Sequence, residues 1–159
     1  MRAYLAGPLG FSEAGRSFLY DRLIPALTEA GVEVVDPWTL ADPAVVKGAH
    51  DLPAGARKQL AWRALNAVIA RTNVEAIDGC DLIVAVLDGV DVDSGTAAEI
   101  GYAYARGKRI LGYRGDFRLA GDNEGATVNL QVEYFIDASG GEIVRTLDAL
   151  VRIAAGDRA

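Results

Sequence analysis

The sequence predicts an α/β protein with a doubly wound parallel sheet of four to five strands, in flavodoxin-like or Rossmann-like order. Short β-branched runs alternate with longer segments of helical period, which is the pattern of repeated strand and helix units. One run, residues 82–87, is wholly apolar, as in a strand buried on both faces of a parallel sheet. An acidic, glycine-containing loop and then a helix follow it, in the order of half a βαβ unit.

The individual elements are predicted from the spacing of apolar residues and from turn residues. Pro25 lies inside the first helix and should kink or split it. Residues 37–55 contain three prolines and two glycines with no sustained period, which predicts a long loop with about one helical turn. In chain order we expect a strand over 3–6, a helix over 12–29, a strand over 32–36, a helix over 56–77, strands over 82–87 and 109–113 with a helix over 96–105 between them, a packed apolar segment over 129–138 with Asn129 as its cap, and an amphipathic helix over 142–155.

Length and composition predict one domain over residues 1–159, large enough to bury its own core. The net charge of −6, without a basic cluster, argues against nucleic acid or an anionic membrane as partner. A single cysteine, Cys80, allows no internal disulfide and fits a reducing cytoplasm. No apolar run is long enough to span a membrane, and the first strand begins without a targeting segment, so we expect a cytoplasmic protein.

The sequence predicts neither a cofactor nor a metal. The dinucleotide motif G-x-G-x-x-G is absent after the first strand, and Pro8 removes an amide that a phosphate would need. His50 is the only histidine, so a histidine-based metal site is excluded. Asp88, Asp91 and Asp93 offer oxygen ligands, but their spacing matches no calcium loop of the EF-hand type. Asp93, nearest the following helix, is the best candidate of the three to bind a sugar hydroxyl.

Glu99 has two compatible interpretations. Thr96 and Glu99 have the spacing of a capping box, in which Thr96 caps a helix and the Glu99 carboxylate returns to the N-cap amide. Alternatively, Glu99 is a nucleophile or base that faces a ligand crevice beyond the end of a strand, where Gly95 lets the ligand approach the backbone.

For the remaining polar and aromatic candidates, the sequence alone favours structural roles. Tyr4, Trp38 and Trp62 are interpreted as packing residues, although an indole could also stack on a base. Arg114 is interpreted, with Asp116 and Arg118, as part of a solvated or interfacial ion cluster.

Three segments together resemble a known family. They are residues 4–8 (Y-L-A-G-P), residues 91–103 (D-V-D-S-G-T-A-A-E-I-G-Y-A) and residues 129–130 (N-L), which lie near the start, middle and end of the chain. In this order they resemble the nucleoside 2-deoxyribosyltransferases. The core D-x-G-x-x-x-E-x-G-Y-A is the most specific part of the likeness.

The resemblance implies a retaining double displacement on a 2′-deoxynucleoside. Glu99 matches the family nucleophile, which attacks C1′ to form a glycosyl ester, as in retaining glycosidases. Tyr4 matches the tyrosine that positions the nucleophile, and Asp93 matches the aspartate that binds sugar hydroxyls. Asn129 matches an asparagine that completes a neighbouring subunit's site, which implies a homo-oligomer. The implied catalytic residues are therefore Glu99, Tyr4 and Asp93, and the implied substrate-binding residues are Gly7, Pro8, Asn73, Ser94, Gly95 and Asn129.

One position departs from the family pattern. Members have an aspartate eight residues before the acidic residue that starts the central strand, and it protonates or orients the base. Counting back from Asp81 gives Asn73. An amide can orient a base through hydrogen bonds but cannot act as a general acid at neutral pH.

Two other functions compete with base exchange. One is N-glycoside hydrolysis of nucleosides or nucleoside 5′-monophosphates, although a carboxylate at Asp93 would repel a phosphate and favours unphosphorylated substrates. The cytokinin-activating phosphoribohydrolases share G-T-x-x-E but have P-G-G where Asp93 and Ser94 stand. The other is a non-catalytic nucleoside-binding protein in which Glu99 only caps its helix.

Overall fold

The computed structural model describes residues 1–156, so the last three residues of the expected domain 1–159 lie outside the described residues. It contains one sheet of five parallel strands in the order β2-β1-β3-β4-β5. The predicted fold class is confirmed, and the strand order is the flavodoxin-like one. The chain reverses its direction of sheet growth between β1 and β3, and ligands of such sheets bind beyond the strand ends at this switch point. The strands are β1 (Arg2–Ala6), β2 (Glu33–Val35), β3 (Leu82–Val86), β4 (Arg109–Tyr113) and β5 (Ile143–Val144).

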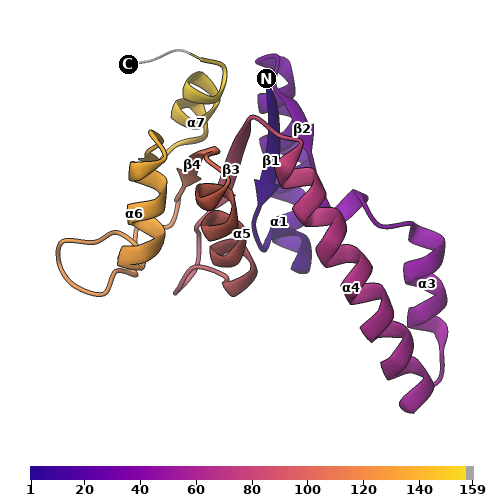
Figure 1. Ribbon diagram of the computed structural model, residues 1–159. Helices are drawn as coiled ribbons and strands as arrows, with labels where there is room; N and C mark the ends of the chain where they lie inside the picture. Colours follow the sequence, from indigo (N-terminus) through magenta and orange to yellow (C-terminus); the bar gives the residue numbers. More distant parts are fainter. Residues whose placement is uncertain (157–159) are drawn as a thin grey trace.

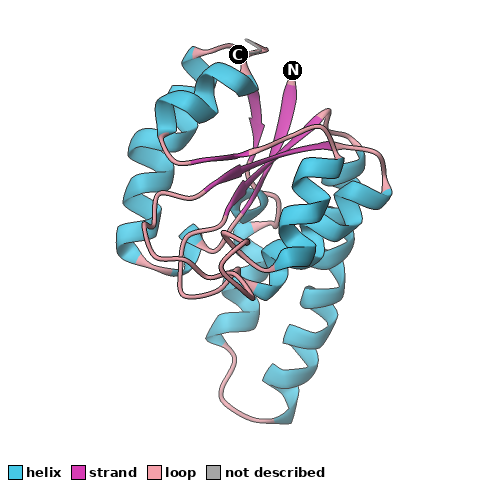
Figure 2. Ribbon diagram, turned by 90° about the vertical axis from the view of Figure 1, so that its left-hand side faces the viewer, coloured by secondary structure: helices cyan, strands magenta, loops and turns pink. Residues whose placement is uncertain are grey.

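Helices cover both faces of the sheet (Figure 2). One face packs against α1 (Glu13–Phe18), α2 (Ile24–Glu29) and α7 (Leu147–Ala154), and the other against α4 (Ala56–Asp78), α5 (Ser94–Ala105) and α6 (Leu130–Ala138). Because side chains alternate along a strand, Leu5 faces the first layer and Tyr4 the second. This alternation directs Tyr4 toward α5, the helix that carries Glu99.

The expected break in the first helix is confirmed. A short 3-10 turn, η1 (Leu9–Phe11), precedes α1, and a π-helical turn, η2 (Leu19–Leu23), separates α1 from α2. Pro25 occupies the first turn of α2, directly after the π-helical turn, where the helical hydrogen-bond pattern has already changed.

Residues 37–55 hold more helix than the sequence predicted. They form a 3-10 turn, η3 (Pro37–Thr39), and the nine-residue helix α3 (Pro43–Asp51), so the expectation of about one helical turn was wrong. The side chain of Asp42 caps α3 by accepting the Ala44 amide at 2.8 Å, and Pro43 follows it in the first turn. The prolines were interpreted as signs of a loop, but proline is also common in the first turn of a helix. The helices α3 and α4 form a hairpin that projects from the body (Figure 1).

The carboxyl-terminal helix begins later than predicted. It starts at Leu147, after Thr146 caps it, and not at residue 142. The preceding Ile143 and Val144 form β5, which pairs with the end of β4. A two-residue strand is too short to show a period, so it could not be predicted from the spacing of apolar residues. By contrast, Asn129 caps α6 as predicted, since its Oδ1 accepts the Gln131 amide at 3.1 Å.

Arg114 is buried, so its interpretation as a solvated or interfacial residue was wrong. Its side chain has 0% exposure and donates to the carbonyl oxygens of Leu87, Gly89 and Arg118. Asp116 and Arg118 do form an ion pair. The Arg114 guanidinium therefore ties the end of β3 to the loop after β4, just upstream of the segment that leads to Asp93.

Candidate active site

The first turns of α5 are held by Asp93, which is the N-cap of this helix. Its Oδ2 accepts the Thr96 amide at 3.0 Å and the Thr96 hydroxyl at 3.2 Å. Thr96 is thus inside the helix, and the capping-box interpretation of Thr96 and Glu99 was wrong. The N-cap lies three residues earlier, at a side chain that is a strong helix cap in its own right.

Glu99 instead faces the carboxyl end of β1. The hydroxyl of Tyr4 donates to Glu99 Oε1 at 2.6 Å. Tyr4 is 0% exposed and comes from β1, at a position paired with Ile83 of β3. The sequence favoured plain packing for Tyr4, but the structure gives its hydroxyl a specific partner across the sheet and helix layers.

Burial and charge shift both of these groups. Burial raises the pKa of Glu99, the hydrogen bond from Tyr4 lowers it in part, and the nearby charge of Asp93 raises it further. Burial also raises the pKa of Tyr4, and the hydrogen bond to Glu99 adds to this. The result is a poorly hydrated carboxylate held in one orientation by a donor that keeps its proton, which suits a nucleophile.

A cavity of about 560 Å³ opens beside these groups. This volume lies in the range of small-molecule sites, about 300–1,000 Å³. It lies between the first turns of α5, the end of β1 and the α3–α4 hairpin. Its lining residues are Gly7, Phe11, Pro37, Trp38, Ala41, Val46, Trp62, Asn66, Ile69, Asn73, Asp93, Gly95, Thr96 and Glu99. We call Asp93 and Glu99, with Tyr4 behind them, the carboxylate wall, and Trp38, Trp62, Asn66, Ile69 and Asn73 the neutral wall.

Most of the neutral wall comes from one face of α4. Trp62, Asn66, Ile69 and Asn73 recur there at helical spacing. The Oδ1 atom of Asn73 is buried and has no hydrogen-bond partner among residues 1–156. A buried acceptor without a partner costs free energy unless a ligand supplies the donor.

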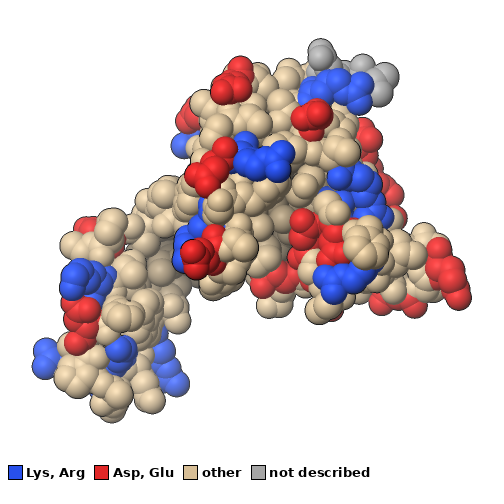
Figure 3. Space-filling view, turned by 180° about the vertical axis from the view of Figure 1, so that it is seen from behind, with Lys and Arg blue, Asp and Glu red and all other residues tan. Residues whose placement is uncertain are grey.

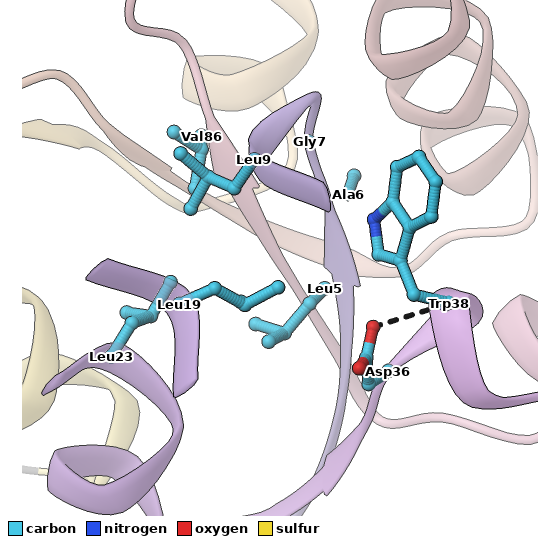
Figure 4. A pocket seen from close by; sticks show the side chains of 9 residues that line it. All are labelled: Leu5, Ala6, Gly7, Leu9, Leu19, Leu23, Asp36, Trp38 and Val86. Carbon is cyan, nitrogen blue, oxygen red and sulfur yellow. Dashed lines mark hydrogen bonds between the residues drawn. The ribbon is translucent and has the colours of Figure 1, made fainter. Parts of the chain in front are cut away.

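Trp38, the member of the neutral wall that does not come from α4, lies on η3 and is held in place by Asp36. Figure 4 shows its indole beside the end of β1, with Asp36 accepting the Trp38 amide at 3.0 Å. The Tyr20 hydroxyl donates to the other oxygen of Asp36, also at 3.0 Å. Gly10 leaves room for the ring, because a Cβ there would overlap the indole.

Sequence reasoning undervalued this wall. It favoured packing for Trp38 and Trp62, whereas both line the cavity, and it did not single out Asn66 or Ile69. The available signal was the shared helix face of Trp62, Asn66, Ile69 and Asn73, next to a long segment with proline and glycine.

The structure gathers some of the residues that the sequence singled out and leaves others apart. Glu99, Asp93, Gly7, Gly95 and Asn73 line the cavity, and Tyr4 contacts Glu99. Pro8, Ser94 and Asn129 are not among the lining residues.

Asn129 lies at the start of α6. Its Nδ2 donates to Asp122 at 3.4 Å. Among the described residues, no group of three or more His, Cys, Asp or Glu side chains is arranged to hold a metal ion. No helix within residues 1–156 is both long and apolar enough to cross a membrane.

Comparison with other sequences identifies a family for the part of the chain that lines this cavity. A sequence model of the nucleoside 2-deoxyribosyltransferase family matches residues 3–131, which include every lining residue of the cavity. An uncharacterized protein from Schizosaccharomyces pombe is 32% identical over 120 residues, or 73% of this chain and 51% of that protein. The chain therefore spans about half the length of this relative.

Three solved structures share the fold. A 2-deoxyribosyltransferase from Bacillus psychrosaccharolyticus has a TM-score of 0.68 at 18% identity, with 95% of this chain and 90% of that chain covered. A 2-deoxyribosyltransferase from Leishmania mexicana has a TM-score of 0.66 at 22% identity, with 99% of each chain covered. A CMP N-glycosidase from Clostridium botulinum has a TM-score of 0.56 at 23% identity, with 96% of each covered. At these identities the likeness establishes the fold alone.

Proposed function

The chain belongs to the nucleoside 2-deoxyribosyltransferase family, and on this premise we propose that it exchanges the base of a 2′-deoxynucleoside through a glycosyl ester on Glu99. The observation that carries the proposal is the Glu99 carboxylate, fixed by the Tyr4 hydroxyl at 2.6 Å, at the edge of a cavity of about 560 Å³. Two indoles and two amides form the facing side of that cavity, which suits a planar heterocycle.

In the first step, a Glu99 oxygen attacks C1′ and the bond from C1′ to the base nitrogen breaks, its electron pair leaving with the base. Positive charge gathers on the sugar in the transition state, so an adjacent carboxylate stabilises it. In the second step, the nitrogen of another base attacks C1′ from the opposite face, the bond from C1′ to the Glu99 oxygen breaks and leaves a carboxylate, and the attacking base loses its N–H proton to water. Two inversions at C1′ retain the configuration. Neither step calls for a metal or a cofactor.

The other residues of the carboxylate wall support sugar binding. Asp93 accepts both Thr96 hydrogen bonds on Oδ2, so we propose that Oδ1 accepts a sugar hydroxyl. Gly7 and Gly95 line the cavity without side chains, which lets the ribose approach the backbone. Pro8 and Ser94, each adjacent to one of these glycines, are assigned to shaping the same sugar site. The Asp93 charge disfavours a 5′-phosphate, so the proposed substrates are unphosphorylated nucleosides and free nucleobases.

The test is incubation of the purified protein with 2′-deoxyinosine, with and without adenine or cytosine, followed by chromatography of bases and nucleosides. The proposal predicts a new deoxynucleoside that appears only when an acceptor base is present. Hypoxanthine released to the same extent with and without acceptor would instead support N-glycoside hydrolysis. A mixture that stays unchanged with the fully folded protein would contradict both base exchange and hydrolysis and favour a binding role.

We also propose a homo-oligomer in which Asn129 completes the site of a neighbouring copy. Asn129 is outside the cavity of its own chain, and Leu130 and Tyr134 beside it are more than half exposed. The projecting hairpin exposes Leu60 and bears basic side chains, visible from behind in Figure 3, on a chain whose net charge is −6. The exposed apolar side chains of Leu60, Leu130 and Tyr134 favour contact with a second copy.

Subunit mixing tests the shared site. Glu99→Gln and Asn129→Ala proteins should each be nearly inactive alone. Mixed after dissociation and reassembly, they should regain about a quarter of wild-type activity in a dimer with reciprocal sites. A fully active monomer, or an Asn129→Ala protein with unchanged activity, would contradict the shared site.

We propose that residues 1–159 act as one domain in the cytoplasm, in nucleoside salvage and without nucleic acid or membrane as partner. The free Cys80 is buried, which fits a reducing compartment.

A further inference from the structure

The cavity is chemically asymmetric, because all of its ionisable side chains lie on one side. Of the fourteen lining residues, only Asp93 and Glu99 can carry a proton that titrates, and both belong to the start of α5. The neutral wall opposite contains two indoles, two amides and an isoleucine. None of these five side chains can donate a proton as an acid at neutral pH.

The groups of the carboxylate wall are committed to other tasks. Glu99 must be ionised to attack C1′, and the attacking oxygen and the departing nitrogen lie on opposite faces of that carbon. Asp93 caps α5 by accepting two hydrogen bonds on Oδ2, and a protonated carboxyl would lose this charge-assisted cap. The Tyr4 hydroxyl donates to Glu99 and is fully buried. No group on this wall is therefore available to protonate the leaving base.

Asn73 can bind the base without protonating it. Its side chain is an amide that lines the cavity, and its buried Oδ1 lacks a partner among the described residues. An N–H or amino group on the edge of a base would satisfy that oxygen. Asn66, two turns earlier on the same face of α4, adds a second amide. The neutral wall thus offers stacking and hydrogen bonds only.

From this asymmetry, and resting on the function proposed above, we infer that the protein releases its base without enzymatic proton donation. The C1′–N bond breaks, its electron pair stays on the base nitrogen, and water in the cavity supplies the proton after departure. The Glu99 oxygen takes the place of the base at C1′. The rate of this step then depends on how well each base leaves unprotonated.

Two substrates that differ in this respect test the inference. 2′-Deoxyguanosine needs a proton on the purine for easy departure, whereas N7-methyl-2′-deoxyguanosine carries its positive charge permanently and releases a neutral base. General acids contribute about 10²–10⁴ in rate, so the methylated substrate should exceed the parent in kcat/KM for base release by about 10²-fold or more. Release is measured by chromatography, after subtraction of the rate without protein.

Variants at Asn73 make the test specific to that position. Asn73→Asp introduces a carboxyl on the neutral wall, so the advantage of the methylated substrate should shrink about tenfold or more. Asn73→Ala removes the amide without adding an acid, so both substrates should slow while their ratio stays near the wild-type value. This control separates loss of binding from gain of a proton donor.

Similar rates for the two substrates on the wild-type protein would overturn the inference, because they would require a proton donor in the protein. An unchanged ratio in a folded and active Asn73→Asp protein would also count against it. Release of no base from either substrate by the folded wild type would contradict the proposed function itself, and the inference with it.

Discussion

The carboxylate wall and the neutral wall face the same cavity but are built in different ways. Tyr4 lies on a central strand, and Asp93 and Glu99 lie at the start of the helix that follows the neighbouring strand. Hydrogen bonds from Tyr4 and Thr96 fix both carboxylates. The neutral wall comes from η3 and from α4, which runs outward into the projecting hairpin (Figure 1).

The two walls therefore have different functions, positioning of the reacting group and binding of the base. The sheet edge fixes the reacting group, where a small displacement would slow the chemistry greatly. The hairpin presents flat and amide surfaces whose identity can change without disturbing the sheet. We therefore expect substitutions in the carboxylate wall to lower turnover, and substitutions in the neutral wall to change which base is bound and how tightly.

The largest effect is expected at Glu99. Glu99→Gln should lower turnover by about 10³-fold or more, because an amide oxygen is a poor nucleophile. At pH 7 the free energy of unfolding of the same variant should be higher by roughly 0.5–2 kcal/mol, because a glutamine does not bury a charge at this position. The measurements are steady-state rates and urea unfolding.

The stability gain at Glu99 should depend on pH in a defined direction. Burial raises the pKa of Glu99 in the folded protein, so the wild type loses stability as the pH rises through that pKa. The difference between Glu99→Gln and wild type should therefore shrink as the pH falls toward about 4, the ordinary value of a glutamate. A Gln variant within tenfold of wild-type turnover, or one less stable at neutral pH, would contradict the role given to this carboxylate.

A smaller effect is expected at Tyr4. Tyr4→Phe should lower kcat by about 10–100-fold through loss of positioning. Because the Tyr4 hydrogen bond lowers the pKa of Glu99, its loss should move the acidic limb of the kcat/KM profile to higher pH. Tyr102→Phe is the matched control, since Tyr102 is on α5 but donates to Asp78 at 3.0 Å. If the acidic limb stays in place in Tyr4→Phe, or moves equally in both variants, the Tyr4 hydroxyl does not lower the pKa of Glu99.

Substitutions in the neutral wall should change substrate binding more than turnover. Trp62→Ala should raise the KM for nucleoside about tenfold with little change in kcat, because base stacking on an aromatic ring is worth about 1–3 kcal/mol. Trp62→Phe should restore most of the affinity, whereas Arg63→Ala, at the exposed next residue, should have no effect. A Trp62→Ala protein with unchanged KM and lowered kcat would abolish the distinction between the two walls.

The smallest effect is expected at Gly10, which touches the cavity only through Trp38. A Cβ in Gly10→Ala would overlap the indole, so the ring must move, at a cost of about 1–3 kcal/mol in stability. The KM should rise only a few-fold. The control is Gly48→Ala in α3, where nothing lies within 4 Å of the added Cβ and the helix should be stabilised by about 0.5–1 kcal/mol. Equal thermal shifts in the two variants would exclude the packing role of Gly10.

The same comparison explains which parts of the molecule the sequence could predict. The strands, α5 and the position of Glu99 follow from local patterns, namely a wholly apolar run and then an acidic loop and helix. The hydrogen bond between Tyr4 and Glu99 spans 95 positions, and no local pattern encodes it. Family resemblance pointed to the pair, but its geometry depends on how α5 packs on β1.

The neutral wall was hidden for a different reason. Trp38 lies in a segment where proline signals suggested a loop, and Trp62 shares its helix face with residues that could equally have been core. Whether an indole is buried or lines a cavity depends on what packs opposite it. Arg114 shows the same limit, because only the fold brings three carbonyl oxygens around its guanidinium.

The most direct test of the central proposal is to trap the sugar on Glu99. In a 2′-deoxy-2′-fluoroarabinosyl purine nucleoside, fluorine disfavours positive charge at C1′ and slows both steps, so the ester should accumulate during a long incubation without an acceptor base. Peptide mass spectrometry after incubation should find one fluorinated sugar on the peptide that contains Glu99, and none in Glu99→Gln. Continued release of base with no adduct, or an adduct on any other residue, would contradict the assignment of Glu99 as the nucleophile.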